Sequence, residues 1–492
     1  MIIKTPSTGI AQSPFTGFPD CRNLDIYSVP GIVKLNNLLS KESGDTVVGL
    51  IKWMVQNPAT PAEIYALDDG GKVYKSADSG DSWALMTGFT AGGHGNGLAI
   101  FKNYLIVARD AYLDVCGDGT AAGITNANWT NSWKAIDSDI LWHPMIISDN
   151  DGKLYGGAER YVFSLEELTT FVPATADTYT WTQQALDLPA NKRIKCLTEL
   201  GNNLELGTWV GTNVYDTREA FIYPWDRSSV TFGQPVKISE HGIHGLLTDG
   251  GIMYVLAGIG GTIYKSDGVN YTQIAQIPAS IADLDGGSWI QFFPGAIIKH
   301  KDRTFFGVSS GSGNIDGMGI WSLKETSQGT ILTLEHSVST GSYGTAAALQ
   351  VGALLQTARD IILAGWRDGT NFGIDRTQVA SRVTSYGGYF LTPFYQVGTN
   401  GQKTKFSEIE FQLAKPLRTN EGIKIAYRTN LIADFTDLGT FDYSTWGGEL
   451  SHNAIFNKGT TSIDIPACEF VQLKISLTGV ATTPEKINTI LK

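Results

Sequence analysis

The chain has little charge, few cysteines and no long apolar run, and each shortage excludes a class of protein. Charged residues make up 17% of the 492 positions, and 37 basic side chains are outnumbered by 48 acidic ones. The formal net charge of −11 has the wrong sign for a surface that wraps nucleic acid. No stretch approaches the roughly 18 consecutive apolar residues of a membrane-spanning helix. We therefore expect a protein that neither wraps nucleic acid nor spans a membrane.

The four cysteines lie far apart and show no metal-binding spacing. They are Cys21, Cys116, Cys196 and Cys468. We interpret them as buried thiols in preference to structural disulfides. The N-terminus also lacks a basic segment followed by an apolar one, so we expect synthesis in the cytoplasm without a signal peptide.

Glycine and aromatic residues are abundant, which suits many short strands joined by tight turns. There are 56 glycines, and 11% of the residues are aromatic. Short apolar runs and Gly/Asp turns recur in units that begin near residues 46, 95, 143, 192, 241, 290 and 347. A period of about 50 residues is typical of β-propeller blades, whereas a β-helix would repeat in much shorter coils. We predict an all-β protein with a propeller of seven blades, and six is the alternative count.

The repeat is flanked by two segments of different character. Residues 1–45 are rich in turn formers, and a strand from this N-terminal segment could add to the last blade and partly close the propeller. The propeller is predicted to span residues 46–385. From residue 390 the pattern changes to longer alternating strands, most clearly at 470–477. We predict that residues 390–492 form an antiparallel β-sandwich.

The stretch at 65–83 is specific enough to assign individual roles. Its first half has apolar runs on both sides of an Asp-Gly turn, which is a strong hairpin signal. A second turn follows, in which the short side chains of Ser76 and Asp78 can bond nearby backbone amides. Gly80 tolerates a positive φ, and Trp83 returns to the apolar layer as a large buried anchor.

Residues 76–83 resemble the Asp box, a turn between the outer strands of blades in sialidase-like β-propellers. The resemblance implies a structural role for Ser76, Asp78, Gly80 and Trp83 and says almost nothing about catalysis. A sialidase would usually also carry an Arg-Ile-Pro stretch near its start, and this sequence has none.

Other candidate sites are weaker than this turn. His241 and His244 form the only close histidine pair, and a metal would need further ligands. Residues 149–152 slightly resemble a Ca²⁺ loop but lack its closing Glu, so we favour a hairpin turn. We predict no catalytic residues, no cofactor and no metal, and hence a protein that is not an enzyme. A hydrolase acting on capsule or sialylated glycans is the alternative for which the sequence names no residues.

Two regions resemble parts of tailed-bacteriophage virion proteins. The opening, residues 9–35, resembles the start of short-tail nozzle and related proteins. Residues 423–428 and 470–475 resemble a sandwich that follows propellers in phage tail proteins. The resemblance implies a non-enzymatic structural protein in the virion tail. Such a protein would form a ring at the nozzle or tail-tube end and line or cap the path by which DNA leaves.

The implied partners are other copies of the chain in a hexameric ring, and other tail or adaptor proteins. DNA would contact the ring only in passage. An acidic lining suits that role because it repels phosphates.

The alternative function is a receptor-binding tail module that recognises host surface glycans. Tryptophans in turn-rich sequence could stack on sugars. The candidates are Trp129, Trp133, Trp225 and Trp446. The competing interpretation, which we favour, makes these side chains core or interface anchors.

We predict that Trp83→Ala lowers the melting temperature much more than Asp78→Ala. Truncating a buried Trp costs about 3–5 kcal/mol, whereas losing a buried hydrogen-bonding partner costs about 1–3 kcal/mol. Thermal unfolding of both variants measures the difference. If Asp78→Ala left stability unchanged and abolished a binding or hydrolytic activity, the structural interpretation of this turn would be wrong.

Overall fold

The structure is a computed structural model. It describes residues 20–25, 34–41, 46–89, 92–138, 141–209, 219–277, 289–312, 318–326, 329–336, 338, 349–382, 388–392, 394–396, 403, 408–413, 419–430, 433–442, 451–455, 465–478 and 489–490. Across these residues the regular elements are β-strands and one short 3-10 helix at Ala176–Thr178, which confirms the all-β prediction.

The chain divides into two compact units. One, the propeller unit, contains residues 40–319 and 338–376. The other, the terminal unit, contains residues 1–39, 320–337 and 377–492. The predicted limits of the propeller, at residue 45 and at residues 385–390, stay a prediction. The grouping of 320–337 with the two terminal segments is a feature that no sequence pattern indicated.

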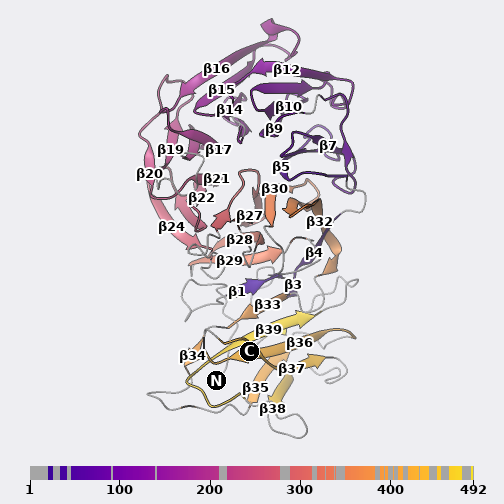
Figure 1. Ribbon diagram of the computed structural model, residues 1–492, viewed down its shortest axis with the longest axis vertical. Helices are drawn as coiled ribbons and strands as arrows, with labels where there is room; N and C mark the ends of the chain where they lie inside the picture. The colour runs from indigo at the N-terminus through magenta and orange to yellow at the C-terminus, as the bar shows by residue number, and fades with distance from the viewer. Residues whose placement is uncertain are drawn as a thin grey trace. The chain divides into compact units, whose positions relative to one another are not determined.

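Six four-stranded sheets are arranged around a common centre as the blades of a β-propeller (Figure 1). The first contains β5 (Ile51–Gln56), β6 (Ile64–Asp68), β7 (Val73–Ser76) and β8 (Ala84–Leu85). The second contains β9 (Gly97–Phe101), β10 (Tyr104–Arg109), β11 (Tyr112–Cys116) and β12 (Trp129–Ala135). The third contains β13 (Met145–Ile147), β14 (Leu154–Ala158), β15 (Tyr161–Glu167) and β16 (Tyr179–Asp187).

The remaining three sheets repeat this antiparallel order. The fourth contains β17 (Arg193–Leu200), β18 (Asn203–Trp209), β19 (Ala220–Trp225) and β20 (Val236–Ile238). The fifth contains β21 (Ile243–Asp249), β22 (Ile252–Ala257), β23 (Thr262–Ser266) and β24 (Tyr271–Gln276). The last contains β30 (Gln350–Gln356), β31 (Ile362–Asp368), β32 (Asn371–Arg382) and the N-terminal strand β4 (Asn37–Lys41).

The sequence predicted seven blades, whereas the described residues form six complete four-stranded sheets. The sequence repeat expected to begin near residue 290 forms a hairpin of β26 (Ile297–His300) and β27 (Arg303–Ser312) in the propeller unit. Strand β25 (Trp289–Gln291) also pairs with β27. Along the chain, each first strand contacts the next in the order β5, β9, β13, β17, β21, β26 and β30, and β30 contacts β5 again. The alternative count of six therefore describes the complete four-stranded sheets.

Each blade buries both of its faces against its neighbours. Strand β6 is buried along its whole length. Its residues Ile64 and Ala66 pack with Leu363 of the last sheet. Its alternate residues Tyr65 and Leu67 pack with the second sheet. Because successive side chains of a strand point to opposite faces, one apolar strand contributes to two separate cores.

The terminal unit contains an extended sheet. Its strands lie in the order β28 (Gly319–Thr326), β29 (Gly329–His336), β1 (Asp20–Arg22), β33 (Gly388–Leu391), β39 (Phe470–Thr478), β36 (Gly422–Arg428) and β37 (Thr436–Asp442), and β34 (Tyr395–Gln396) also pairs with β39. The other sheets of this unit are the pair β2 (Leu24–Asp25) and β3 (Lys34–Leu35), and a sheet in the order β38 (Ser451–Ile455), β35 (Glu408–Leu413) and β40 (Thr489–Ile490). The predicted C-terminal sandwich is not confirmed by this strand order.

All four cysteines are buried thiols, as predicted. Burial raises the pKa of the Cys116 and Cys196 thiols to about 12, which keeps both protonated and unreactive at neutral pH. No helix in the described part of the chain is long and apolar enough to cross a membrane.

We predict that Glu205→Gln makes folding stability less dependent on pH. Glu205 lies buried on β18, and burial raises its pKa from 4.5 to about 7. Because the pKa is higher in the folded state, the protonated wild-type side chain makes its full contribution to stability below about pH 4.5. This contribution is lost as the pH rises to about 7. The advantage of the variant should grow over that range to about 3 kcal/mol. Urea unfolding at several pH values measures it, and a constant difference would contradict the assignment.

Candidate functional site

Two buried lysines from distant blades meet at one tryptophan ring in the propeller unit. Lys52 lies on β5 and Lys195 on β17, with 7% and 4% of their surface exposed. Trp142 lies just before β13 and is also buried. The Lys52 amine is 4.3 Å from the centre of the Trp142 ring, and the Lys195 amine is 4.8 Å from it. Such cation–π contacts favour the charged amines most when water is excluded. We call this group the axial lysine site.

Lys52 is held by polar groups of the second blade and of the segment that enters the third. Its Nζ donates to the Leu141 carbonyl at 2.6 Å and to Asn96 Oδ1 at 3.2 Å. Asn96 is fully buried, and its backbone N–H donates to the Ala108 carbonyl. These bonds connect β5 to segments that lie 44 and 89 positions along the chain.

Lys195 contacts the fifth blade and the segment that leads to β26. Its Nζ lies 2.7 Å from Nδ1 of His244 on β21 and donates to the Phe292 carbonyl at 3.4 Å. Burial, and to a smaller extent the charge of Lys52, lowers the pKa of Lys195 to about 7. Burial, together with the charge of Lys195, also keeps the pKa of His244 well below its usual range. A neutral His244 can accept the bond that Lys195 donates.

Aromatic rings and a further histidine complete the surroundings of Trp142. The ring of Phe293 packs edge-on to Trp142 at 5.8 Å. The two nitrogens of His143 each lie 3.0 Å from a backbone carbonyl oxygen, of Gly157 and of Asp110. Side chains from the first, third, fourth and fifth blades thus converge where the inner strands meet.

The chemistry of this site is that of a buried cationic group. Lys195 is surrounded by neutral acceptors, and no carboxylate in the described ranges pairs with it. A buried charge without an opposite charge is costly unless it loses its proton or gains a counter-ion. Within the same ranges, no group of three or more His, Cys, Asp or Glu side chains could hold a metal. The arrangement therefore suits an anion better than a cation.

The predicted Asp box forms a turn with its own internal bonds. The Gly80 amide donates to Ser76 Oγ at 2.8 Å, and the Ser82 amide donates to Asp78 Oδ1 at 2.9 Å. Burial alone would raise the pKa of Asp78, but bonds from Ser82 and Ser76 hold it below its ordinary value. Trp83 packs in the core between the first and last sheets. These contacts are local and structural in kind.

Gly80 has two reasons to be glycine. Its φ is +93°, and an added Cβ would lie 2.7 Å from a methyl group of Leu363 in the last sheet. A side chain here would strain the turn and collide with a neighbouring blade.

Turns in which an Asp side chain accepts bonds from nearby backbone amides also follow the third strand of three other blades. Asp118 accepts from the Thr120 amide at 2.9 Å. Asp226 accepts from Ser229 at 2.7 Å, and Asp267 accepts from Asn270 at 2.8 Å. These bonds lower the pKa of Asp226 and of Asp267 to about 2. Only the turn at 76–83 has the full Asp-box sequence; the turn at 267–271 is a decayed copy with Tyr271 in place of the Trp, and the other two differ in spacing.

The tryptophans proposed to stack on glycans are mostly packing residues. Trp225 is 2% exposed, and its Nε1 donates to the Ser229 carbonyl. Its ring has no exposed face on which a sugar could stack, so the prediction for this residue is wrong. Trp129 is half-buried and packs on Phe89 with 4.5 Å between ring centres. Trp133 is half-buried among aromatic residues of the third blade. Trp446 lies outside the described residues.

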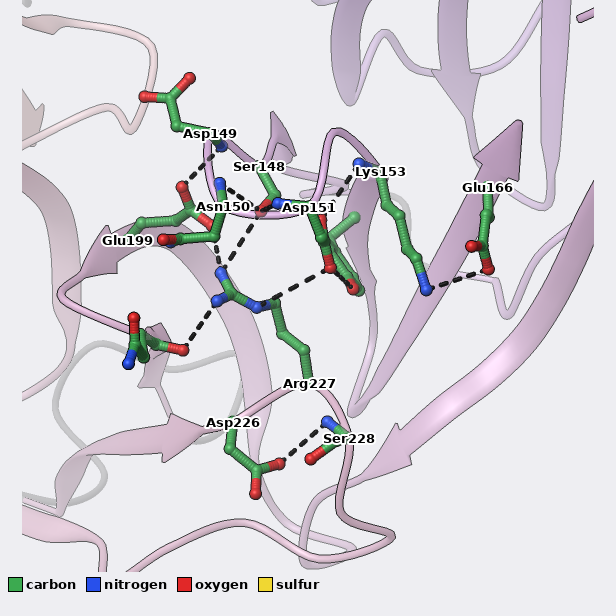
Figure 2. A network of polar contacts seen from close by, with 12 residues as sticks. Ser148, Asp149, Asn150, Asp151, Lys153, Glu166, Glu199, Asp226, Arg227 and Ser228 are labelled. Carbon is green, nitrogen blue, oxygen red and sulfur yellow. Dashed lines mark hydrogen bonds and ion pairs between the residues drawn. The ribbon is translucent and has the colours of Figure 1, made fainter. Parts of the chain in front are cut away.

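Figure 2 shows a second polar cluster, which joins the third and fourth blades through Arg227. The guanidinium pairs with Glu199, donates to the Asn202 carbonyl at 2.7 Å and to Ser148 Oγ at 3.3 Å, and lies 4.0 Å from Asp151. The turn that weakly resembled a Ca²⁺ loop is therefore a hairpin turn whose carboxylate faces an arginine. Its role is to hold neighbouring blades together.

Comparisons with known proteins support the fold class alone. No family model and no curated protein matches the chain. Among solved structures, it is similar to the β-propeller domain of Cps50 (Swd1) from Myceliophteria thermophila, with 9% identity, a TM-score of 0.45 and coverage of 69% of this chain and 99% of that one. It is also similar to YCF48 bound to D1 peptide, with 11% identity, a TM-score of 0.46 and coverage of 72% and 97%. The third similar structure is that of the WD40 repeats of RRP9, with 12% identity, a TM-score of 0.46 and coverage of 70% of this chain and 98% of that one. The chain is therefore a β-propeller protein by its fold. Similarity with TM-scores below 0.5 and identities of 9–12% carries no argument about function.

The axial lysine site was not predicted from the sequence. A signal did exist, because each lysine interrupts an apolar inner-strand run, at 47–53 and at 194–197. A lysine in such a run is rarely buried without a specific partner. What the sequence does not indicate is that both amines face one ring.

We predict that Arg227→Met lowers the unfolding free energy by about 2–4 kcal/mol, because removing one partner leaves the carboxylate of Glu199 buried without its counter-charge. The side chains of Arg227 and Glu199 are 8% and 12% exposed. Lys153→Met is the matched control, since its pair with Glu166 is 30% and 42% exposed. The control should cost less than about 1 kcal/mol. Equal losses in urea unfolding would contradict a clamp centred on Arg227.

Proposed function

We propose that the chain is a non-enzymatic structural protein of a tailed-bacteriophage virion. In this proposal it forms a ring at the nozzle or tail-tube end and lines or caps the DNA exit path. It is made in the host cytoplasm and resides in the tail. Its partners are further copies of itself, in a hexameric ring, and other tail or adaptor proteins.

One observation carries the proposal. The two regions that resemble virion proteins lie at opposite ends of the sequence, yet they contribute strands to the same sheet of the terminal unit. Strand β1 comes from the opening region, and β36 and β39 from the C-terminal one. Both resemblances therefore concern a single folded element.

The register of this sheet shows how closely the regions are connected. Cys21 lies opposite Phe390, Phe390 opposite Ile475, and Ile475 opposite Ile425. All four side chains are buried. On the other face, the amine of Lys474 and the guanidinium of Arg22 lie 4.0 and 5.5 Å from the ring centre of Tyr389. A row of buried residues across four strands makes the opening segment an integral part of the C-terminal sheet.

We also infer the finer architecture that accompanies this function. The hairpin of β26 and β27 acts as the inner half of a seventh blade, since β26 lies between β21 and β30 in the ring of inner strands. The strands β35, β38 and β40 serve as the second layer of a C-terminal sandwich. In a hexamer, the formal charge would be roughly six times the net −11 of one chain, a field that repels passing DNA.

The receptor-binding alternative has less support. Of its four tryptophans, Trp225 is buried, and Trp129 and Trp133 pack against neighbouring aromatic side chains. A glycan site would therefore depend on other residues than these three.

Locating the chain in purified particles tests the proposal directly. Mass spectrometry of density-purified virions should find the protein at a constant ratio to the major tail proteins. Gold-labelled antibody should mark the tail, and native mass spectrometry of the isolated protein or tail should give a ring mass. A protein found in the lysate and absent from washed virions would rule the proposal out.

We predict that Phe390→Ala reduces incorporation into particles. Phe390 is buried at the centre of the shared sheet, and truncating such a side chain costs about 3–5 kcal/mol. The matched control is Phe470→Ala on β39, where 37% of the side chain is already exposed. Complementing a phage that lacks the gene with each variant measures incorporation. Normal incorporation of Phe390→Ala, with the sheet shown to be destabilised, would separate this sheet from virion assembly.

A further inference from the structure

The axial lysine site combines burial and positive charge, and no described residue places an opposite charge at Lys195. The titratable groups close enough to act on the Lys195 amine are Lys52 from β5, His244 from β21 and its own neighbour Cys196. The first is a like charge, and the other two are neutral at moderate pH because burial lowers the pKa of His244 and raises that of Cys196. The nearest polar acceptors, His244 Nδ1 and the Phe292 carbonyl, are uncharged as well. Among the described residues, the charge of Lys195 is thus balanced by dipoles and a ring face alone.

We propose that the axial lysine site binds a monovalent anion of about the size of chloride. The anion would lie against the Lys195 amine, on a side away from the electronegative face of the Trp142 ring. The amine would keep its proton and supply a charge-assisted hydrogen bond, which is stronger than a bond between neutral groups. Lys52, on the same ring, would add a second positive charge.

The surroundings favour a halide over phosphate or sulfate. Moving an ion out of water costs free energy that rises with the square of its charge, so a divalent oxyanion loses far more than a halide. Trp142, Phe292 and Phe293 are apolar neighbours that cannot solvate the outer oxygens of a phosphate. A halide needs only the cation and a few N–H or C–H contacts. The proposal is independent of a place in the virion, because it rests on the propeller unit alone.

Bromide is the probe for this site, because it replaces chloride and scatters anomalously. A crystal of the full chain grown or soaked in sodium bromide should show an anomalous peak in contact with Lys195 Nζ. In thermal unfolding at pH 6, bromide should raise the melting temperature relative to sodium gluconate at the same ionic strength. At ten times the dissociation constant, the unfolding equilibrium constant should fall about tenfold.

Two variants separate the site from general salt effects. Lys195→Met should abolish the bromide-specific rise, because it replaces the ammonium by an apolar chain of similar length. Lys237→Met is the matched control: it removes one positive charge from β20 of the same blade, where the amine is half exposed and paired with Glu219. This control should keep the full bromide effect.

The pH dependence gives an independent readout. The wild-type bromide effect should be larger at pH 6 than at pH 9, since the anion binds the protonated amine. An equal bromide effect in Lys195→Met would overturn the proposal. So would the absence of an anomalous peak at Lys195, a result that decides the matter even if the variant does not fold.

Discussion

Mutual burial of blade faces is the constraint on which the rest of the structure depends. A single four-stranded sheet such as β5–β8 has two apolar faces and can cover neither by itself. Tyr65 and Leu67 need the second sheet, while Ile64 and Ala66 need the last one. Each blade is therefore stable only between two others, and the series ends only when the chain returns to its first blade. The interblade clamp at Arg227 and the glycine at position 80 serve this packing, since both allow adjacent sheets to approach closely.

The same constraint creates the axial lysine site. Closing the ring brings the inner strands together, so residues from blades that are not neighbours can share one small volume. Lys52 and Lys195 meet at Trp142 although they come from the first and fourth sheets. Water is excluded there, and this strengthens every electrostatic interaction. The site thus differs in kind from the Asp turns of the outer rim, where carboxylates bond their own backbone amides and remain open to solvent.

Local features could be predicted from the sequence, and convergent ones could not. The hairpin at 65–76 and the turn of Ser76 and Asp78 involve residues within a few positions of each other, so their chemistry is visible in the order of residues. The pair of Lys195 and His244 spans 49 positions, and its geometry depends on the angle between two blades. Burial was equally hidden: the sequence presented Trp225 as a turn residue, whereas it packs in a core between two sheets. The inclusion of residues 320–337 in the terminal unit also follows from strand pairing over a long distance, for which no periodicity exists.

The pairing of β1 with β33 has a consequence for the time at which the protein becomes complete. Cys21 leaves the ribosome early, but its partner Phe390 is made much later. At about 5–20 residues per second, β1 waits roughly 15–60 s for its first native neighbour, β29, and roughly 20–75 s for β33. The outer strand β4 waits in the same way for β32. The first strands to be made are therefore paired only after most of the chain has been synthesised, and the nascent chain carries an open-ended series of blades until then. Folding of this molecule is governed by the order of synthesis as well as by stability.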